Sequence, residues 1–311
     1  MALSEFGLIQ RFFTQPSLKN PINQLGVGDD CALMDIPDGY QLAITTDTMV
    51  ENVHFFKEVD PYHLGHKLLA VNLSDLASMG AKPVSVTLAL TLPHINENWL
   101  AKFSKGFLSL ADHYNVDLIG GDTTRGALTL TVQALGVVPK NKAMTRSKAQ
   151  IGDLIYVTGK IGDAGLGLKI KQGYYCENPA HALQQFNQPL PCINDGLAIR
   201  DLAHACIDIS DGVVADLGHI LEKSNVGALI EFDKLPLSND VKTYIKKTGD
   251  WQLPLIAGDD YQLCFTLPPE NAAQLNIDCQ QIGMITADKK MSIQYQGKII
   301  NMNAQGYEHF S

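Results

Sequence analysis

The hydrophobic pattern of the first half of the chain predicts alternating strands and helices. Apolar residues recur at helical spacing in residues 5–13, in 62–79, where the pattern stops at Gly80, and in 98–114. Shorter apolar runs predict strands at 31–35, 40–46, 84–92, 116–120 and 128–138. Because the first two strands flank the turn sequence Pro37-Asp38-Gly39, they are expected to form a hairpin. The order β-β-α-β-α-β-β indicates a mixed α/β unit.

A polar and basic stretch, residues 139–150, separates this unit from a second pattern. We therefore predict a domain boundary near residue 145, with an N-terminal domain 1–145 and a C-terminal domain 146–311. The second domain is expected to contain helices in 159–171, 190–205 and 212–224. Its expected strands are 153–158, 228–232, 264–267 and 281–285, with a hairpin formed by 291–295 and 298–302. The fold class is α/β (α+β) with two domains.

Composition and charge exclude several classes of protein. The 311 residues are 45% hydrophobic and 18% charged, which is typical of a globular chain long enough for two domains. A formal net charge of -9, with scattered lysines and arginines, argues against nucleic-acid binding. The six cysteines form no C-x-x-C pair, so they are expected to be small core residues in a reducing compartment. No membrane-spanning or targeting pattern is evident, and we expect a cytoplasmic protein.

Aspartates recur in short turns that are marked by glycine, serine or threonine. The turns are Gly28-Asp29-Asp30, Thr45-Thr46-Asp47, Asn72-Leu73-Ser74-Asp75, Gly120-Gly121-Asp122-Thr123, Asp208-Ile209-Ser210-Asp211-Gly212 and Gly258-Asp259-Asp260. Because each turn follows or joins an apolar run, the carboxylates are expected at strand or helix ends around a shared cleft. Clustered carboxylates repel one another unless cations lie between them, and Mg²⁺ prefers such oxygen ligands together with substrate phosphates. The pattern predicts a nucleotide enzyme, although a single aspartate in a turn more commonly caps a helix or closes an Asx-turn.

The usual phosphate-binding loops are absent from the sequence. Neither G-x-x-x-x-G-K-[ST] nor G-x-G-x-x-G occurs, and 162–167 is the nearest approach. Phosphate charge would then be met by metal ions, helix N-termini and a few basic side chains. Asp211 either caps the helix that starts near Val213 or presents phosphate and metal ligands there. Arg146 is either a bidentate phosphate ligand or a solvated linker residue, and His54 is either a site residue or a structural group.

Taken together, the motifs resemble bacterial thiamine-monophosphate kinases. The resemblance rests on six segments in the same order and spacing, namely 26–32, 45–55, 71–83, 120–123, 208–212 and 258–261, and it spans nearly the whole chain. It implies the two-domain fold of the aminoimidazole ribonucleotide synthetase superfamily, with an N-terminal mixed sheet used for homodimer formation. It also implies ATP-dependent phosphorylation of thiamine monophosphate to thiamine diphosphate.

The resemblance further assigns roles to individual residues. Several Mg²⁺ ions would be held by a set of oxygen ligands: Asp30, Thr45, Thr46, Asp47, Asp75, Asp122, Asp208 and Asp211. Four of these aspartates would carry the catalysis, namely Asp30, Asp75, Asp122 and Asp208. The residues expected around ATP are Gly121, Asp122, Arg146, Ser210 and Asp211. Thiamine monophosphate would contact His54, Asp259 and Tyr307, although the family usually has glutamate at the position of Asp259.

The chemistry of the acceptor agrees with this assignment. A phosphate monoester has a second pKa of about 6, so the acceptor needs little general-base help near neutral pH. Direct in-line transfer without a phosphorylated enzyme is therefore expected. Alternatives are another ATP-dependent synthetase of the superfamily or a non-catalytic protein that binds calcium. Selenophosphate synthesis is disfavoured because no cysteine precedes Gly26. A hydrogenase-maturation carbamoyl dehydratase is disfavoured because the sequence ends in Glu308-His309-Phe310-Ser311, without a C-terminal cysteine.

Overall fold

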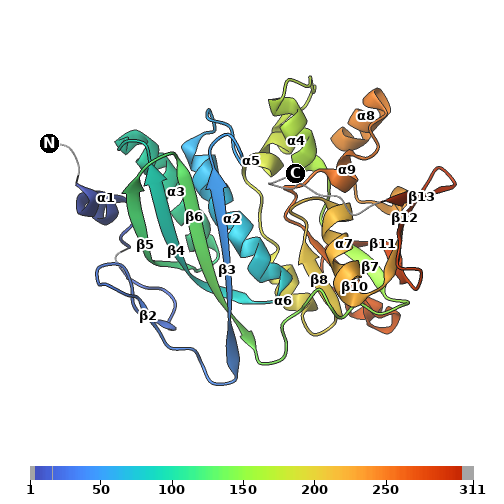
Figure 1. Ribbon diagram of the computed structural model, residues 1–311, viewed down its shortest axis with the longest axis horizontal. Coiled ribbons are helices and arrows are strands. Elements are labelled where there is room, and N and C mark those ends of the chain that lie inside the picture. Colours follow the sequence, from blue (N-terminus) through green and yellow to red (C-terminus); the bar gives the residue numbers. More distant parts are fainter. Residues whose placement is uncertain (1–3, 16, 303–311) are drawn as a thin grey trace. The chain divides into compact units, whose positions relative to one another are not determined.

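The computed structural model describes residues 4–15 and 17–302, and the chain divides into two compact units (Figure 1). The first unit comprises Met1–Leu76 and Ala81–Asn141, and the second comprises Ala77–Gly80 and Lys142–Ser311. Each unit combines one principal β-sheet with helices. The predicted α/β class with two domains is therefore confirmed.

The first unit is built on a four-stranded sheet with the order β3-β6-β4-β5. Its strands are β3 (Tyr40–Val50), β4 (Lys82–Leu92), β5 (Asp117–Arg125) and β6 (Thr129–Pro139). Strand β6 is antiparallel to both of its neighbours, whereas β4 and β5 are parallel and are joined by α3 (Glu97–His113). The other elements of this unit are α1 (Glu5–Phe12), α2 (Pro61–Ser78), β1 (Asn23–Leu25) and β2 (Leu33–Met34).

Helix α3 shows why the periodicity of this half was informative. Asn96 caps it by accepting a hydrogen bond from the backbone of Trp99 at 3.1 Å. The side chains of Leu100, Phe103 and Phe107 recur every three or four residues and are fully buried. Helix α2 has no such clear stripe, because its apolar residues are buried around much of its circumference. Burial of α2 fixes the helix that carries Asn72 and Asp75.

The second unit contains a seven-stranded sheet with the order β13-β12-β9-β11-β7-β10-β8. Its strands are β7 (Leu154–Thr158), β8 (Ala205–Asp208), β9 (Gly227–Glu231), β10 (Leu263–Leu267), β11 (Cys279–Thr286), β12 (Met291–Tyr295) and β13 (Lys298–Met302). The helices are α4 (Asp163–Lys171), α5 (Ala180–Asn187), α6 (Ile193–Ile199), α7 (Val213–Ser224), α8 (Asn239–Thr248) and α9 (Leu253–Ile256), with 3₁₀ turns at Phe232–Lys234 and Pro269–Gln274. Nearly all neighbouring strands are antiparallel, and the β9–β12 pair is parallel.

Several local predictions were wrong. Strands β2 and β3 do not form a hairpin, because β2 pairs with β1 and β3 pairs with β6 over its whole length. The helix predicted over 190–205 is limited to α6, and the chain enters β8 at Ala205. The cysteines are not all core residues either, since Cys31 is exposed while Cys206 and Cys264 are buried. For the hairpin and the helix, a long-range pairing in a sheet overrides the local pattern.

No helix within residues 4–15 and 17–302 is both long and apolar enough to cross a membrane.

Candidate functional site

In the first unit, strand β3 and helix α2 bring Thr45, Asp47 and Asp75 together. Thr45 and Asp47 are two residues apart on β3, so their side chains point to the same face of the sheet. The Thr45 hydroxyl donates a hydrogen bond to Oδ2 of Asp75 on α2. Asp47 and Asp75 are thus not at strand or helix ends as expected, but inside a strand and inside a helix. Elements that are held along their whole length restrict these side chains more than a loop would.

Asn72, for which no role was predicted, fixes this arrangement. Its Oδ1 accepts a hydrogen bond from the backbone of Asp47 at 3.1 Å, and its Nδ2 donates to Leu68 O at 3.0 Å. The side chain is completely buried, so both partners are needed to avoid unpaired polar groups. Asn72 lies three positions before Asp75 on α2, which puts the two residues on the same helix face. The signal in the sequence was the amide side chain at the start of the motif Asn72-Leu73-Ser74-Asp75, within an apolar helical pattern.

The electrostatics of this group fit a cation. Burial, together with the charge of Asp75, raises the pKa of Asp47 to about 6. A nearby cation would remove this penalty by stabilising both ionised carboxylates. No group of three or more His, Cys, Asp or Glu residues suited to a metal occurs in the described part of the chain. Mg²⁺, however, commonly takes one or two carboxylates and completes its shell with waters and substrate phosphates. The Asp47–Asp75 pair therefore fits part of a magnesium shell.

Other predicted ligands of the first unit lie elsewhere. Thr46 lies between Thr45 and Asp47 on β3, so its side chain points to the opposite face of the sheet. That face also carries Asp122, which is aligned across the strands with Ala89, Thr131 and Thr48. The hydroxyls of Thr48 and Thr131, which are neighbours in this cross-strand row, form a hydrogen bond of 2.9 Å on the same face. Asp122 is exposed and lies within β5, and Asp30 is exposed in the segment between β1 and β2. The structure thus separates the predicted set between two faces of the sheet.

Gly121 precedes Asp122 at a point where no side chain fits. A Cβ atom at this position would lie 1.9 Å from Leu88 O on the paired strand β4. At the neighbouring Gly120, the nearest atom to an added Cβ would be the Thr87 methyl at 3.9 Å. Close approach of the two backbones therefore requires glycine at 121 and not at 120.

We expect Gly121→Ala to lower the free energy of unfolding by ~2 kcal/mol or more, because β5 must move away from β4. Gly120→Ala is the matched control and should change it by less than ~0.5 kcal/mol. Urea unfolding of both variants followed by circular dichroism measures the difference. Equal midpoints for the two variants would contradict the close approach.

In the second unit, two acidic turns meet because β8 and β10 are paired. Asp208 ends β8 opposite Leu263 of β10, so the turns that follow β8 and precede β10 lie together. The backbone of Asp259 donates to Ser210 O at 2.8 Å, and that of Tyr261 donates to Ile209 O at 2.8 Å. A Cβ atom at Gly258 would lie 2.0 Å from Ser210 O, which shows how closely the two turns approach. Asp259 therefore lies in one region with Asp208, Ser210 and Asp211, although about fifty residues separate it from them in the sequence.

Asp216, which the sequence did not single out, holds the first of these turns. Its Oδ2 accepts hydrogen bonds from the backbones of Ser210 and Asp211, both at 3.0 Å. Burial, together with the charge of Asp208, raises the pKa of Asp216 to about 8. The N-cap of α7 is Gly212, so Asp211 lies one residue before the cap position.

Asp260 serves the fold at the start of α4. Its carboxylate accepts hydrogen bonds from the backbones of Gly162 at 2.8 Å and Ala164 at 3.4 Å. Burial raises the pKa of Asp260 to about 8. Asp163, on the same helix terminus, accepts a hydrogen bond from the hydroxyl of Ser238 at 2.6 Å. The glycine-rich stretch 162–167 is therefore a helix start whose backbone N–H groups are bound by the buried carboxylate of Asp260.

The remaining predicted residues occupy different settings. Nδ1 of His54 accepts a hydrogen bond from the backbone of Val50 at 3.0 Å in the turn after β3. Asp259 has a left-handed backbone with φ of 69°, and its Oδ1 accepts a hydrogen bond from the Tyr261 hydroxyl at 2.9 Å. Arg146 is exposed in the segment before β7. Tyr307 lies outside the described residues.

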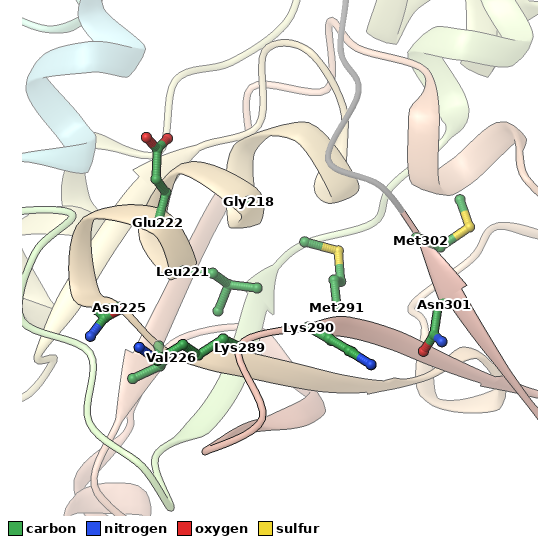
Figure 2. A pocket seen from close by; sticks show the side chains of 10 residues that line it. All are labelled: Gly218, Leu221, Glu222, Asn225, Val226, Lys289, Lys290, Met291, Asn301 and Met302. Carbon is green, nitrogen blue, oxygen red and sulfur yellow. The ribbon is translucent and has the colours of Figure 1, made fainter.

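The second unit contains a cavity of about 650 Å³, and none of the predicted site residues within the described part of the chain lines it (Figure 2). It lies between the C-terminal half of α7 and the strands β12 and β13, with Glu222, Lys290 and Asn301 among its lining residues. The acidic turns before α7 and before β10 contribute no residue to it.

Comparison with known proteins gives consistent results. Residues 28–138 match the family described as AIR synthase related protein, N-terminal domain, and residues 150–296 match the corresponding C-terminal domain. The thiamine-monophosphate kinase of Haemophilus influenzae is 46% identical over 100% of this chain and 99% of its own. The crystal structure of thiamine-monophosphate kinase from Stenotrophomonas maltophilia has a TM-score of 0.85 and 39% identity, covering 96% of this chain and 98% of that one. AaThiL complexed with AMPPCP and TMP has a TM-score of 0.79 and 31% identity, covering 99% and 97%.

Proposed function

The chain belongs to the thiamine-monophosphate kinase family, and from this premise we propose that it transfers the γ-phosphoryl group of ATP to thiamine monophosphate, forming thiamine diphosphate. The observation that carries the proposal is the match along the entire chain, which includes every acidic turn. A match to one domain would have supported the fold alone. The product follows from joining the transferred phosphoryl group to the acceptor phosphate.

The reaction brings two anions together, so the protein has to supply positive charge and orientation. The acceptor phosphate is mostly deprotonated near neutral pH and can attack without a strong general base. In-line transfer then depends on positioning and on stabilising the equatorial oxygens of the transferred group. Carboxylates that hold cations close to the phosphates meet this requirement.

We assign the metal-binding role to the residues that the family resemblance indicates. Asp47 and Asp75, with Thr45 beside them, would hold Mg²⁺ in the first unit, and Asp208 and Asp211 would do so in the second. Mg²⁺ supplies charge neutralisation for the β- and γ-phosphates. Asp30, Thr46 and Asp122 would be ligands of further ions, because Thr46 and Asp122 belong to the opposite face of the sheet from the Asp47–Asp75 pair. The catalytic residues in this assignment would be Asp30, Asp75, Asp122 and Asp208, as ligands of these ions.

ATP and the acceptor would be bound by the remaining residues. Around ATP we place Gly121, Asp122, Arg146, Ser210 and Asp211. The backbone of Ser210 and Asp211, held by Asp216, precedes the N-terminus of α7, where the helix dipole favours phosphate. Asp259, His54 and Tyr307 would contact thiamine monophosphate. Asp259 is one methylene shorter than the usual glutamate, so its carboxylate extends less far toward the substrate.

A coupled assay of ATP consumption tests the proposal. ATP should be consumed only when thiamine monophosphate and Mg²⁺ are both present, and thiamine diphosphate should accumulate in equal amount. ATP consumption that is independent of thiamine monophosphate would point to another synthetase of the superfamily. The absence of turnover together with calcium binding would favour the non-catalytic alternative.

We also propose that the protein is a homodimer in the cytoplasm. All six cysteines are free, which fits a reducing compartment. Strand β3 is at the edge of the first sheet, and Leu42 and Ile44 on its outward face are 38% and 57% exposed. An edge strand with exposed apolar residues favours association with a second copy.

Introducing a charge on this face is expected to abolish the dimer. Ile44→Lys should convert a particle of twice 33.9 kDa into one of 33.9 kDa in sedimentation at micromolar concentration. Ile299→Lys on β13, where the side chain is 60% exposed, is the matched control and should leave the dimer intact. A wild-type protein that sediments only as a monomer would rule out the proposal.

A further inference from the structure

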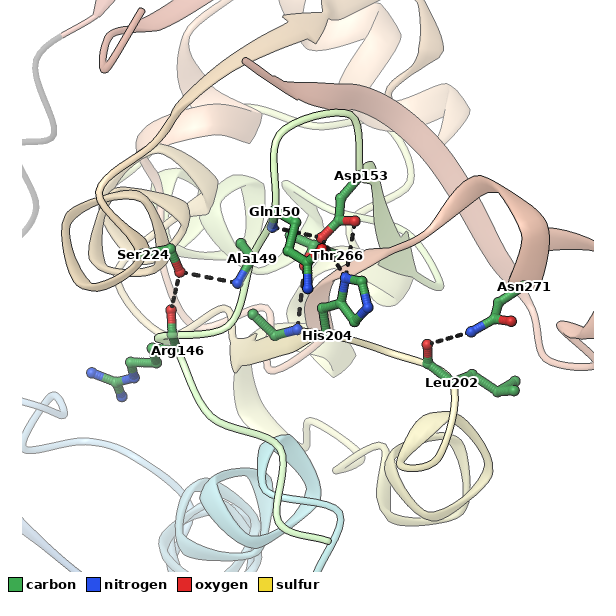
Figure 3. A network of polar contacts seen from close by, with 10 residues as sticks. Arg146, Ala149, Gln150, Asp153, Leu202, His204, Ser224, Thr266 and Asn271 are labelled. Carbon is green, nitrogen blue, oxygen red and sulfur yellow. Dashed lines mark hydrogen bonds and ion pairs between the residues drawn. The ribbon is translucent and has the colours of Figure 1, made fainter. Parts of the chain in front are cut away.

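The segment that carries Arg146 is fixed at several points by residues of the second unit. Thr145 forms a β-bridge with Ala205 at the start of β8. The Ser224 hydroxyl, at the end of α7, donates a hydrogen bond to Arg146 O at 2.8 Å and accepts one from the backbone of Ala149 at 3.1 Å. One hydroxyl therefore holds both ends of a four-residue stretch (Figure 3).

A second clamp holds the end of the same segment. Asp153 is buried, and its Oδ2 accepts a hydrogen bond from the backbone of Gln150 at 2.9 Å. Both carboxylate oxygens of Asp153 are 3.0 Å from Nδ1 of His204, in the turn before β8. The backbone of His204 in turn donates to Thr266 O of β10 at 2.9 Å. The segment is thus tied to the seven-stranded sheet as well as to α7.

The side chain of Arg146 takes no part in this network. Arg146 is exposed, and its guanidinium points away from Ser224, Ala149 and Gln150 (Figure 3). A long side chain on a rigid backbone loses less conformational freedom on binding than one on a mobile loop. A planar guanidinium suits bidentate binding of a phosphate. The hydrogen bonds of the segment therefore prepare Arg146 to bind an anion.

We propose that Ser224 is a positioning residue for ATP binding, because it fixes the backbone from which Arg146 reaches a phosphate of ATP. This inference rests on the proposed function, which identifies the anion as a nucleoside triphosphate. Ser224 does not contact the nucleotide. It lies at the C-terminal end of α7, whereas Ser210 and Asp211 precede the N-terminal end of the same helix. Helix α7 thus links two groups of residues that act on one ligand.

The test compares three variants with the wild type. Ser224→Ala removes both hydrogen bonds of the hydroxyl and should raise the KM for ATP about five- to tenfold, with a smaller change in kcat. Ser224→Thr keeps a hydroxyl and should restore most of the affinity. Asn271→Ala is the matched control, since Asn271 Nδ2 donates to Leu202 O at 3.0 Å in the same region without contacting the Arg146 segment. It should leave the KM for ATP unchanged.

A double-mutant cycle shows whether Ser224 acts through Arg146. In an Arg146→Ala background, Ser224→Ala should have little further effect on the affinity for a non-hydrolysable ATP analogue, measured by calorimetry. Additive effects, or an unchanged affinity in either single variant, would overturn the inference. Calorimetry does not require turnover, so a protein that binds the analogue but does not phosphorylate thiamine monophosphate would refute the proposed function alone. Thermal unfolding of each variant separates loss of binding from loss of fold.

Discussion

Replacing Asp75 by asparagine is expected to lower turnover at least ~100-fold while the protein remains folded. Asparagine has nearly the same shape as aspartate, and its amide oxygen can still accept the hydrogen bond from Thr45. What the variant loses is one of two adjacent negative charges, and with it the binding of a cation close to the transferred phosphoryl group. The measurement is kcat at saturating ATP and thiamine monophosphate over a series of Mg²⁺ concentrations.

A suitable control is Asp112→Asn at the end of α3. Asp112 forms an exposed ion pair with Lys19, so its replacement removes a charge from the same unit without touching the Asp47–Asp75 pair. Exposed ion pairs contribute at most ~1 kcal/mol, and activity should be unchanged. If Asp75→Asn kept near-normal activity throughout the Mg²⁺ series, the proposed metal site at Asp47 and Asp75 would be wrong.

Unphosphorylated thiamine is expected to be a very poor acceptor, at least ~100-fold slower than its monophosphate. Its hydroxyl would have to lose a proton during transfer, and a positioned general base is typically worth 10²–10⁴ in rate. His54 does not offer Nδ1 for this purpose, because that nitrogen accepts a hydrogen bond from Val50. The phosphate of thiamine monophosphate needs no such base. Steady-state rates with each acceptor at matched concentrations give the ratio.

The same experiment with γ-labelled ATP distinguishes direct transfer from a covalent route. Direct in-line transfer leaves no label on the protein, whether or not the acceptor is present. Label that stays on the protein after denaturation, and that is discharged by thiamine monophosphate, would establish a phosphorylated intermediate. Thiamine consumed as fast as its monophosphate would likewise contradict the assignment of the acceptor phosphate as nucleophile.

The periodicity of the sequence predicted elements best where local and tertiary preferences agree. Helix α3 and the hairpin of β12 and β13 were confirmed, because a regular apolar face and a Gln296-Gly297 turn are properties of adjacent residues. Helices α5 and α8 were missed, and β2 was assigned the wrong partner. Strand pairing depends on residues that are far apart in the chain, and a local turn sequence does not specify it.

The sequence by itself determined the family and the chemistry, because the order and spacing of the acidic turns can be read without knowing the tertiary contacts of these residues. Only the tertiary structure decided how those residues are held. It put Asp47 and Asp75 inside regular elements joined by Asn72, separated Thr46 and Asp122 to the other face, and assigned Asp216 to the turn before α7. Side-chain direction and hydrogen-bond partners follow from sheet register and helix packing, and these are set by contacts along the whole chain.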